Sequence, residues 1–278
     1  MTVNIKQINY SELLKDAITK EGKLLEAYRA FHNFSLLNRI YACFQLAALG
    51  KDITPIKTFN QWKEANRHVK RGEKALELCM PINKTWYRYC DDKKFIPFST
   101  SKEQIEKLLV SGKVEKFQYK DFLFKKYWFS LSQTDGQEFE PENININWNK
   151  QKALTELSIN EIPFSIINGN CQGYVTEKNE IAINPLAQLP VKTLFHEIAH
   201  ILLGHTNKEV LTDNQDLTIN LMEVEAEATS LLCLESLGLK GSEYCRGYIQ
   251  NWYNGHEIPE KSAQRIISAA EKILKAGN

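Results

Sequence analysis

The stretch TLFHEIAHILLGH, Thr193–His205, constrains the fold more than any other part of this 278-residue sequence. Apolar residues recur along it at i, i+3, i+4 and i+7, which predicts an amphipathic helix over residues 190–203 with Pro190 in its first turn. His196 and His200 are one helical turn apart, so both imidazoles project from one face and can bind a single metal ion. This H-E-x-x-H spacing is typical of zinc peptidases. The alternative is a buried helix that carries its histidines by chance.

A metal site of this kind needs a third protein ligand and a general base. Glu197 lies about 100° around the helix from His196, beside the ion, where its carboxylate can take a proton from an activated water. Glu197 is therefore the predicted catalytic residue. Glu223 and Glu227 are four residues apart in NLMEVEAEATSLLCLESLGL and share a helix face. We expect Glu223 to be the third ligand of Zn²⁺ or another divalent metal and Glu227 to hold the second nitrogen of a histidine, with the reverse assignment as the alternative.

His205 is a less suitable ligand by its spacing. It follows His196 by nine residues, whereas the longer zincin pattern has a histidine ten residues on and a glycine seven residues on. Gly204 is expected to end the helix, and His205 to be a cap or a surface residue. Glu225 is expected to point away from the face shared by Glu223 and Glu227.

Composition favours a soluble globular protein, with 43% hydrophobic and 25% charged residues. The N-terminal residues lack an apolar segment, and nowhere do about eighteen apolar residues follow one another, so neither a secretory signal nor a membrane span is expected. Six cysteines are scattered without a C-x-x-C pair. This distribution favours free thiols and a cytoplasmic location.

The charge is divided unevenly along the chain. Residues 1–135 carry 24 basic and 15 acidic side chains, a net of +9, whereas residues 136–278 carry 11 and 19, a net of −8. This asymmetry predicts two modules, the first with a polyanionic partner. The polar, asparagine-rich segment 136–150 is the expected linker, which gives domains over residues 1–135 and 151–278.

Periodicity predicts an α+β fold. The first half is expected to contain two or more helices within residues 1–50, a short helix from Thr58 that breaks at Gly72, aromatic-rich strands near 77–90 and 126–134, and a charged helical insertion at 101–116. The second half is expected to contain a helix near 150–158, a strand at 163–168, a hairpin turning at Lys178-Asn179, and helices at 190–203, 217–237, 241–253 and 259–275.

Several segments resemble one known family. LFHEIAHILLGH, with EVEAEATSLLCLESLGL after it and GYVTEKNEIAIN before it, resembles the zincin-like domain of the ArdC antirestriction proteins and, more distantly, the IrrE/ImmA metallopeptidases. FHNFSLLNRIYACFQLA, FNQWKEANRHVKRGEKALELCMPI and YWFSLSQTDGQE are similar to the N-terminal domain of ArdC-type proteins. The resemblance implies a mixed helix and strand domain that binds single-stranded DNA, followed by a zincin-like metallopeptidase domain, in a mobile-element protein. Ala65-Asn66 departs from the expected turn sequence.

A basic groove with aromatic faces is what single-stranded DNA requires, because phosphates need cations and bases stack on rings. The first half supplies both kinds of residue. The candidate DNA-binding residues are Asn33, Ser35, Asn38, Arg39, Trp62, Lys63, Arg67, Lys70, Arg71, Lys74, Trp86 and Arg88. For Trp62 and Trp86 the alternative is a place in the protein core.

Three functions agree with these patterns. The first is an antirestriction-like protein that binds single-stranded DNA and carries a zinc metallopeptidase site. The second is a non-catalytic protein that shields DNA, in which the metal only stabilises the fold. The third is an IrrE/ImmA-like protease that cleaves a protein partner, with the basic half as the docking surface for that acidic protein.

Overall fold

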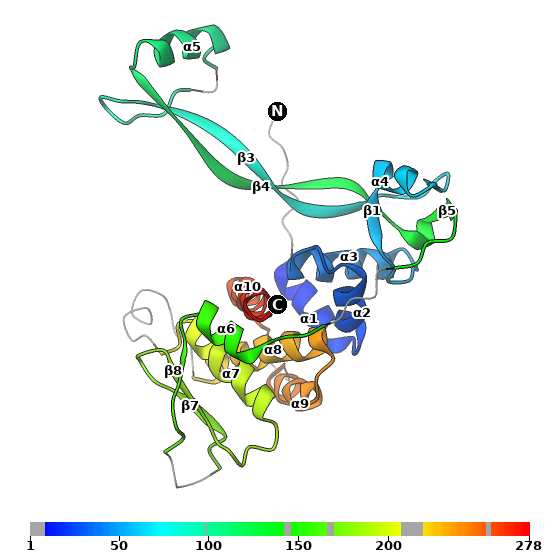
Figure 1. Ribbon diagram of the computed structural model, residues 1–278, viewed down its shortest axis with the longest axis vertical. Coiled ribbons are helices and arrows are strands. Elements are labelled where there is room, and N and C mark those ends of the chain that lie inside the picture. The colour runs from blue at the N-terminus through cyan, green and yellow to red at the C-terminus, as the bar shows by residue number, and fades with distance from the viewer. Residues whose placement is uncertain (1–8, 98, 142–145, 166–169, 207–218, 254–256) are drawn as a thin grey trace. The chain divides into compact units, whose positions relative to one another are not determined.

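The computed structural model of the chain is shown in Figure 1. It describes residues 9–97, 99–141, 146–165, 170–206, 219–253 and 257–278. The fold is α+β, as predicted, and divides into two compact units: residues 1–76 with 128–278, and residues 77–127. Within the described ranges, no helix is both long and apolar enough to cross a membrane.

The first unit begins with the expected helices. These are α1 (Tyr10–Thr19), α2 (Lys23–Ala30) and α3 (Leu36–Ala48). They pack against helices of the C-terminal half, and Gly22 donates its backbone N–H to Glu235 over 3.0 Å. The structure therefore groups residues 1–76 with the C-terminal half, and these compact units do not follow the boundaries expected from charge.

Short strands and one helix follow. They are β1 (Ile56–Thr58), α4 (Phe59–Glu64), β2 (Arg67–Val69), the 3₁₀ turn η1 (Leu131–Gln133) and β5 (Thr134–Gly136). The helix starts after Thr58, as predicted, and Thr58 caps it in a capping box. The helix ends at Glu64, not at Gly72, because Asn66 is left-handed with φ +55° and starts the antiparallel pairing of β2 with β5.

The second unit contains most of β3 (Leu76–Tyr89) and β4 (Val114–Ser130), with α5 (Lys102–Val110) between them in sequence. The strands lie side by side in the sheet β1-β4-β3 (Figure 1). The helical insertion is confirmed, but β4 starts at Val114, earlier than the predicted 126. Aromatic residues, which favour strands, already occur before residue 126 at Phe117, Tyr119, Phe122 and Phe124.

The sheet of the C-terminal half consists of β6 (Asn160–Glu161), β7 (Gly173–Val175) and β8 (Glu180–Ile183), in the order β6-β8-β7. Helix α6 (Lys150–Glu156) precedes it. The predicted hairpin is confirmed, with Asn179 at φ +58° in its turn. The predicted strand at 163–168 is replaced by β6, which pairs in parallel with β8; residues 163–165 are not in a strand, and 166–168 lie outside the described residues.

Four helices complete the chain at the predicted places. They are α7 (Pro190–Leu202), α8 (Ile219–Leu237), α9 (Ser242–Tyr253) and α10 (Glu260–Ala276). Helix α8 is central: every residue from Val224 to Leu237 is buried, and α2, α7, α9 and α10 pack around it. A helix buried on all sides is normally apolar throughout. The buried glutamates of α8 therefore require an explanation, and two of them belong to the site described next. All six cysteines are free thiols.

Candidate metal centre and nucleic-acid interface

Helix α7 fixes the two histidines. Its apolar face, formed by Leu194, Phe195, Ile198 and Ala199, is at most 3% exposed and holds the helix against the core. The opposite side presents His196 and His200, whose ring centroids are 4.7 Å apart and whose Nε2 atoms are 3.0 Å apart. Both imidazoles therefore turn the same ring nitrogen toward one point.

Glu223 of α8 completes a triangle of ligand atoms. Its carboxylate oxygens lie 3.4 Å from Nε2 of His196 and 3.5 Å from Nε2 of His200. Four ligands at about 2.0–2.1 Å around Zn²⁺ would be separated by about 3.3 Å along each tetrahedron edge. The three side chains therefore fit one divalent ion, and all three ligand atoms lie within 4.8 Å of one another.

Glu227 is placed one turn further along α8. Its Oε1 lies 3.3 Å from Nδ1 of His196 and 2.6 Å from Nζ of Lys192. Glu227 thus contacts the histidine nitrogen that faces away from Glu223, which favours Glu223 as the ligand. The Lys192 ammonium compensates the charge of Glu227 in this buried position.

The neighbouring charges shift the pKa values of the two histidines in opposite directions. Burial lowers the pKa of His196, but the Glu223 and Glu227 carboxylates outweigh this effect and raise it to about 9. Burial and the neighbouring positive His196 lower the pKa of His200 to about 4. His196 is therefore the protonated member of the pair at neutral pH and donates to Nε2 of a neutral His200.

Glu197 lies beside this cluster on the buried side. It is 7% exposed, and burial raises the pKa of its carboxyl to about 7, although the charge of His196 opposes the shift. A carboxyl group with a pKa near neutrality can both accept and release a proton. The positive charge of a bound ion would lower this pKa and favour the carboxylate.

Gly173 of β7 leaves the space that Glu197 needs. A Cβ atom at Gly173 would lie 2.7 Å from Cγ2 of Thr193 and 3.1 Å from Oε1 of Glu197. Any side chain here would displace one of these groups. Among the described residues β7 is an edge strand of its sheet, and it packs against α7 (Figure 1).

His205 was expected to be a cap or a surface residue; its backbone N–H does cap α7, but its side chain is not at the surface. Its side chain is 3% exposed, with Nδ1 2.9 Å from Nδ1 of His200 and Nε2 2.8 Å from the Glu225 carboxylate. Contact with Nδ1 of His200 places His205 on the side of that ring away from the triangle of ligand atoms. Sequence reasoning missed Glu225, because an acidic residue on the opposite helix face normally indicates solvent.

Tyr248 of α9 is a second residue that the sequence did not indicate. Its side chain is partly exposed, and burial together with the Glu223 and Glu227 carboxylates raises the pKa of its hydroxyl. Two carboxylates of the candidate centre therefore act on this hydroxyl. A phenol in such a position can donate a hydrogen bond to a bound substrate.

Several predicted DNA-binding residues instead stabilise the fold. Trp62 is 0% exposed and donates its indole N–H to the Phe129 carbonyl over 2.8 Å, so it cannot stack on a base. Arg39 donates to the carbonyls of Phe31 and His32 and stacks on Tyr28. Two more candidates stabilise the start of α3. Ser35 is the N-cap of this helix, and the buried Asn38 donates its backbone N–H to the Ser35 side chain.

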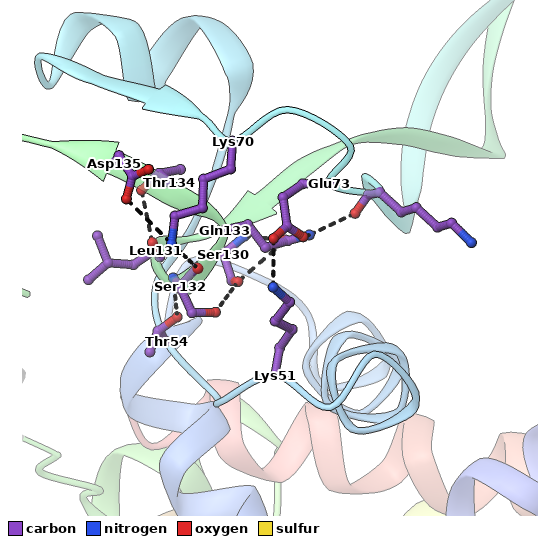
Figure 2. Close-up of polar contacts among 11 residues, drawn as sticks. Lys51, Thr54, Lys70, Glu73, Ser130, Leu131, Ser132, Gln133, Thr134 and Asp135 are labelled. Carbon is purple, nitrogen blue, oxygen red and sulfur yellow. Dashed lines mark hydrogen bonds and ion pairs between the residues drawn. The ribbon is translucent and has the colours of Figure 1, made fainter.

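Figure 2 shows a polar network that joins two of the segments that are similar to the N-terminal domain of ArdC-type proteins. The Glu73 carboxylate accepts from Lys51 over 2.6 Å and from the Gln133 amide over 3.0 Å. Lys70 donates to the Ser132 carbonyl over 3.3 Å and lies 3.4 Å from Asp135. Residues 69–74 and 129–134, which belong to these two segments, are therefore structural partners, and the ammonium group of Lys70 is engaged in this network.

The remaining DNA-binding candidates are distributed over both units. Arg67 bonds to Thr134 and to the Gln137 carbonyl. In the second unit Trp86 packs on Phe95 and Tyr119, and Arg88 pairs with Glu115 over 2.5 Å. The candidates with exposed side chains are Asn33, Lys63, Arg71 and Lys74.

Solved structures share this fold. The metal-free crystal structure of the antirestriction ArdC protein from plasmid R388 has a TM-score of 0.51 at 17% sequence identity, covering 96% of this chain and 94% of that chain. The Mn(II)-bound structure of the same protein has a TM-score of 0.52 at 16% identity, covering 98% of each chain. This chain has the ArdC fold. The resemblance seen in the sequence is thereby confirmed at the level of the fold.

One curated sequence is also similar. The uncharacterized protein pXO2-81 of Bacillus anthracis is 26% identical over 248 residues, which cover 78% of this chain and 41% of that protein. The chain thus spans about two fifths of the length of this relative. No protein-family model matches the sequence.

Proposed function

We propose that the chain is an ArdC-type antirestriction protein of a mobile genetic element, which binds single-stranded DNA and carries a zinc-dependent metallopeptidase site. The observation that carries the proposal is the convergence of His196, His200 and Glu223 beside the buried Glu197. The shared fold with the antirestriction ArdC protein from plasmid R388 supports the biological role. The free cysteines agree with action in the cytoplasm.

The metal would be held by His196, His200 and Glu223. The Mn(II) bound in the neighbouring ArdC structure supports a divalent ion at this fold. Two imidazoles and one carboxylate are the ligand set of catalytic zinc in several peptidases, which is why we propose Zn²⁺. When bound, the ion would supply Lewis-acid polarisation of a peptide carbonyl.

The chain's own residues would perform the remaining steps of peptide hydrolysis. The Glu197 carboxylate takes a proton from the attacking water and later gives it to the leaving amine. Glu227 holds Nδ1 of His196, so that its Nε2 faces the ion. The free edge of β7 can pair with the backbone of an extended peptide, which would bring a scissile bond alongside Glu197.

Metal content tests the first part of this proposal. We expect the wild-type chain to retain one equivalent of Zn²⁺ after gel filtration, and the Glu223→Ala variant to lose most of it, because two histidines alone bind weakly. Inductively coupled plasma mass spectrometry measures the metal. Glu161→Ala removes a carboxylate that pairs with exposed Lys150 and serves as the control. Wild-type protein without bound metal would contradict the proposal.

The DNA-binding part is supported by the basic first half and by the exposed lysine and arginine side chains there. Arg71 and Lys74 are both exposed and flank Glu73 of the network in Figure 2. Because the network fixes the backbone on both sides of Glu73, these two cations are held on a rigid turn. Exposed cations on such a turn are suited to phosphate contacts.

Reversing both charges should weaken DNA binding. For Arg71→Glu with Lys74→Glu we expect at least a tenfold loss in affinity for a labelled single-stranded oligonucleotide, and a salt slope smaller by about 1.4, since each lost phosphate contact removes about 0.7. Fluorescence anisotropy at several salt concentrations measures both. Lys178→Glu with Lys240→Glu changes net charge equally at exposed positions of the C-terminal half and should bind as the wild type does. Equal losses in both double variants would argue against a defined contact.

A further inference from the structure

His205 lies behind His200, on the side of the ring away from the candidate metal. The two Nδ1 atoms are 2.9 Å apart, and the ring centroids are 5.0 Å apart at 68°. Since Nε2 of His200 faces the other ligands, its Nδ1 is the nitrogen that remains free to be oriented. His205 is the residue that contacts it.

The end of α7 explains how His205 reaches this position. Gly204 has φ +74°, and its N–H donates to the Ile201 carbonyl over 3.0 Å. The N–H of His205 donates to the carbonyl of His200 over 2.9 Å. These two bonds form a Schellman motif, which turns the chain back toward the helix. His205 is thereby held by its backbone next to the residue that its ring contacts.

Glu225 supports His205 from the central helix α8. One carboxylate oxygen lies 2.8 Å from Nε2 of His205, and the side chain is 0% exposed. The other oxygen lies 3.6 Å from the guanidinium of Arg265, which also donates to the Leu203 carbonyl. The charge of Glu225 is thus compensated, while its hydrogen bond is directed at His205.

The Glu225 carboxylate determines which nitrogen donates in the two hydrogen bonds that link Glu225, His205 and His200. An ionised carboxylate only accepts, so Nε2 of His205 must carry a proton and donate it to Glu225. Nδ1 of a neutral His205 then has a lone pair and accepts from Nδ1–H of His200. His200 is left with its lone pair on Nε2, the atom that faces Glu223.

We propose that His205 and Glu225 are positioning residues that fix the tautomer and the ring orientation of His200 for metal binding. This inference rests on the proposed metal site and adds to it two residues that do not touch the ion. Burial of Glu225 supports it, because a carboxylate placed inside a helical core adds little stability by itself.

The proposal is tested with a pair of variants at one position. His205→Leu and His205→Asn both remove the partner of Glu225, but only asparagine offers an oxygen near the place of Nδ1. We expect His205→Leu to bind Zn²⁺ 10–100-fold more weakly in competition with a chelator, the usual effect of losing such a partner. His205→Asn should lie closer to the wild type. Equal Zn²⁺ affinities of the two variants, lowered or unchanged, would overturn the proposal.

Glu235→Gln controls for loss of stability. Glu235 is also a buried carboxylate of α8, but it pairs with Arg246 over 2.8 Å and does not contact the histidines. We expect Glu235→Gln to lower the thermal unfolding midpoint without changing the Zn²⁺ affinity. A matching loss of affinity in this variant would mean that stability, not positioning, explains the His205 result.

A metal-free measurement separates this inference from the proposed function. Long-range ¹⁵N NMR of the wild-type histidine rings should show His200 protonated on Nδ1 and His205 on Nε2. The opposite tautomer of His205 would overturn the inference, even if Zn²⁺ binds. If Zn²⁺ does not bind but these tautomers are found, the proposed function fails while the arrangement of His205 and Glu225 stands.

Discussion

Glu197→Gln is expected to abolish peptide hydrolysis while the chain keeps its metal. Glutamine has the shape of glutamate but cannot take a proton from water, and loss of a general base commonly slows a reaction by about 10²–10⁴-fold. His196, His200 and Glu223 are unchanged, so metal content should equal that of the wild type. Cleavage of a defined peptide pool, followed by mass spectrometry, measures the activity, and plasma mass spectrometry measures the metal.

The same variant separates enzymatic from purely protective action. Glu197 lies in the C-terminal half, and the exposed Arg71 and Lys74 lie on a turn of the N-terminal half, so binding of a single-stranded oligonucleotide should not change. If protection of DNA against a restriction enzyme is lost together with cleavage, the peptidase takes part in antirestriction. Full protection by Glu197→Gln, or a wild type that cleaves no peptide, would favour the DNA-shielding function with a structural metal.

Local periodicity was sufficient to bring the metal-binding candidates together. His196 and His200 must share a face of any helix over this segment, and Glu223 and Glu227 must do so on theirs. The prediction needed one assumption about tertiary structure, namely that these two helices pack against each other. It holds because α8 is buried on all sides from Val224 to Leu237 and α7 packs against it.

The role of His205 could not be predicted from spacing. Its approach to His200 depends on the chain reversal at Gly204, and its partner Glu225 comes from another helix. A pattern rule that counts residues along one helix treats His205 as one position short of a ligand. The structure shows that the reversal directs it to the other nitrogen of His200.

Composition also overestimated the DNA-binding surface. Aromatic and basic residues in the first half suggested a groove, but composition does not say which N–H groups a fold uses internally. The Trp62 indole and the Arg39 guanidinium both donate to backbone carbonyls. Likewise, packing of α2 on α8 could not be predicted, because such long-range contacts leave no periodic pattern in the sequence.

Metal affinity should depend steeply on pH at pH values well above those at which an ordinary histidine titrates. The ligand form of an imidazole is neutral, and the pKa of His196 is raised to about 9 in the metal-free protein. Below that pH a metal ion must displace one proton, so affinity should rise about tenfold per pH unit as the pH increases. His200, with its pKa lowered to about 4, should contribute no second proton above pH 5.

Co²⁺ titrations at pH 6, 7 and 8 test this dependence. We expect at least a hundredfold gain in affinity over this range and, at pH 8, the release of close to one proton per ion, which calorimetry in buffers of different ionisation enthalpy measures. At pH 6 the Glu197 carboxyl, whose pKa is raised to about 7, should add a second proton because the bound ion favours its carboxylate form. Two ordinary histidines, with pKa values near 6.5, would instead release almost no protons at pH 8.

Glu227→Gln removes one of the anions that raise the pKa of His196, so this variant should release fewer protons at pH 8, whereas Glu235→Gln should match the wild type. Absence of proton release at pH 8 in the wild type would show that His196 is neutral before the metal binds.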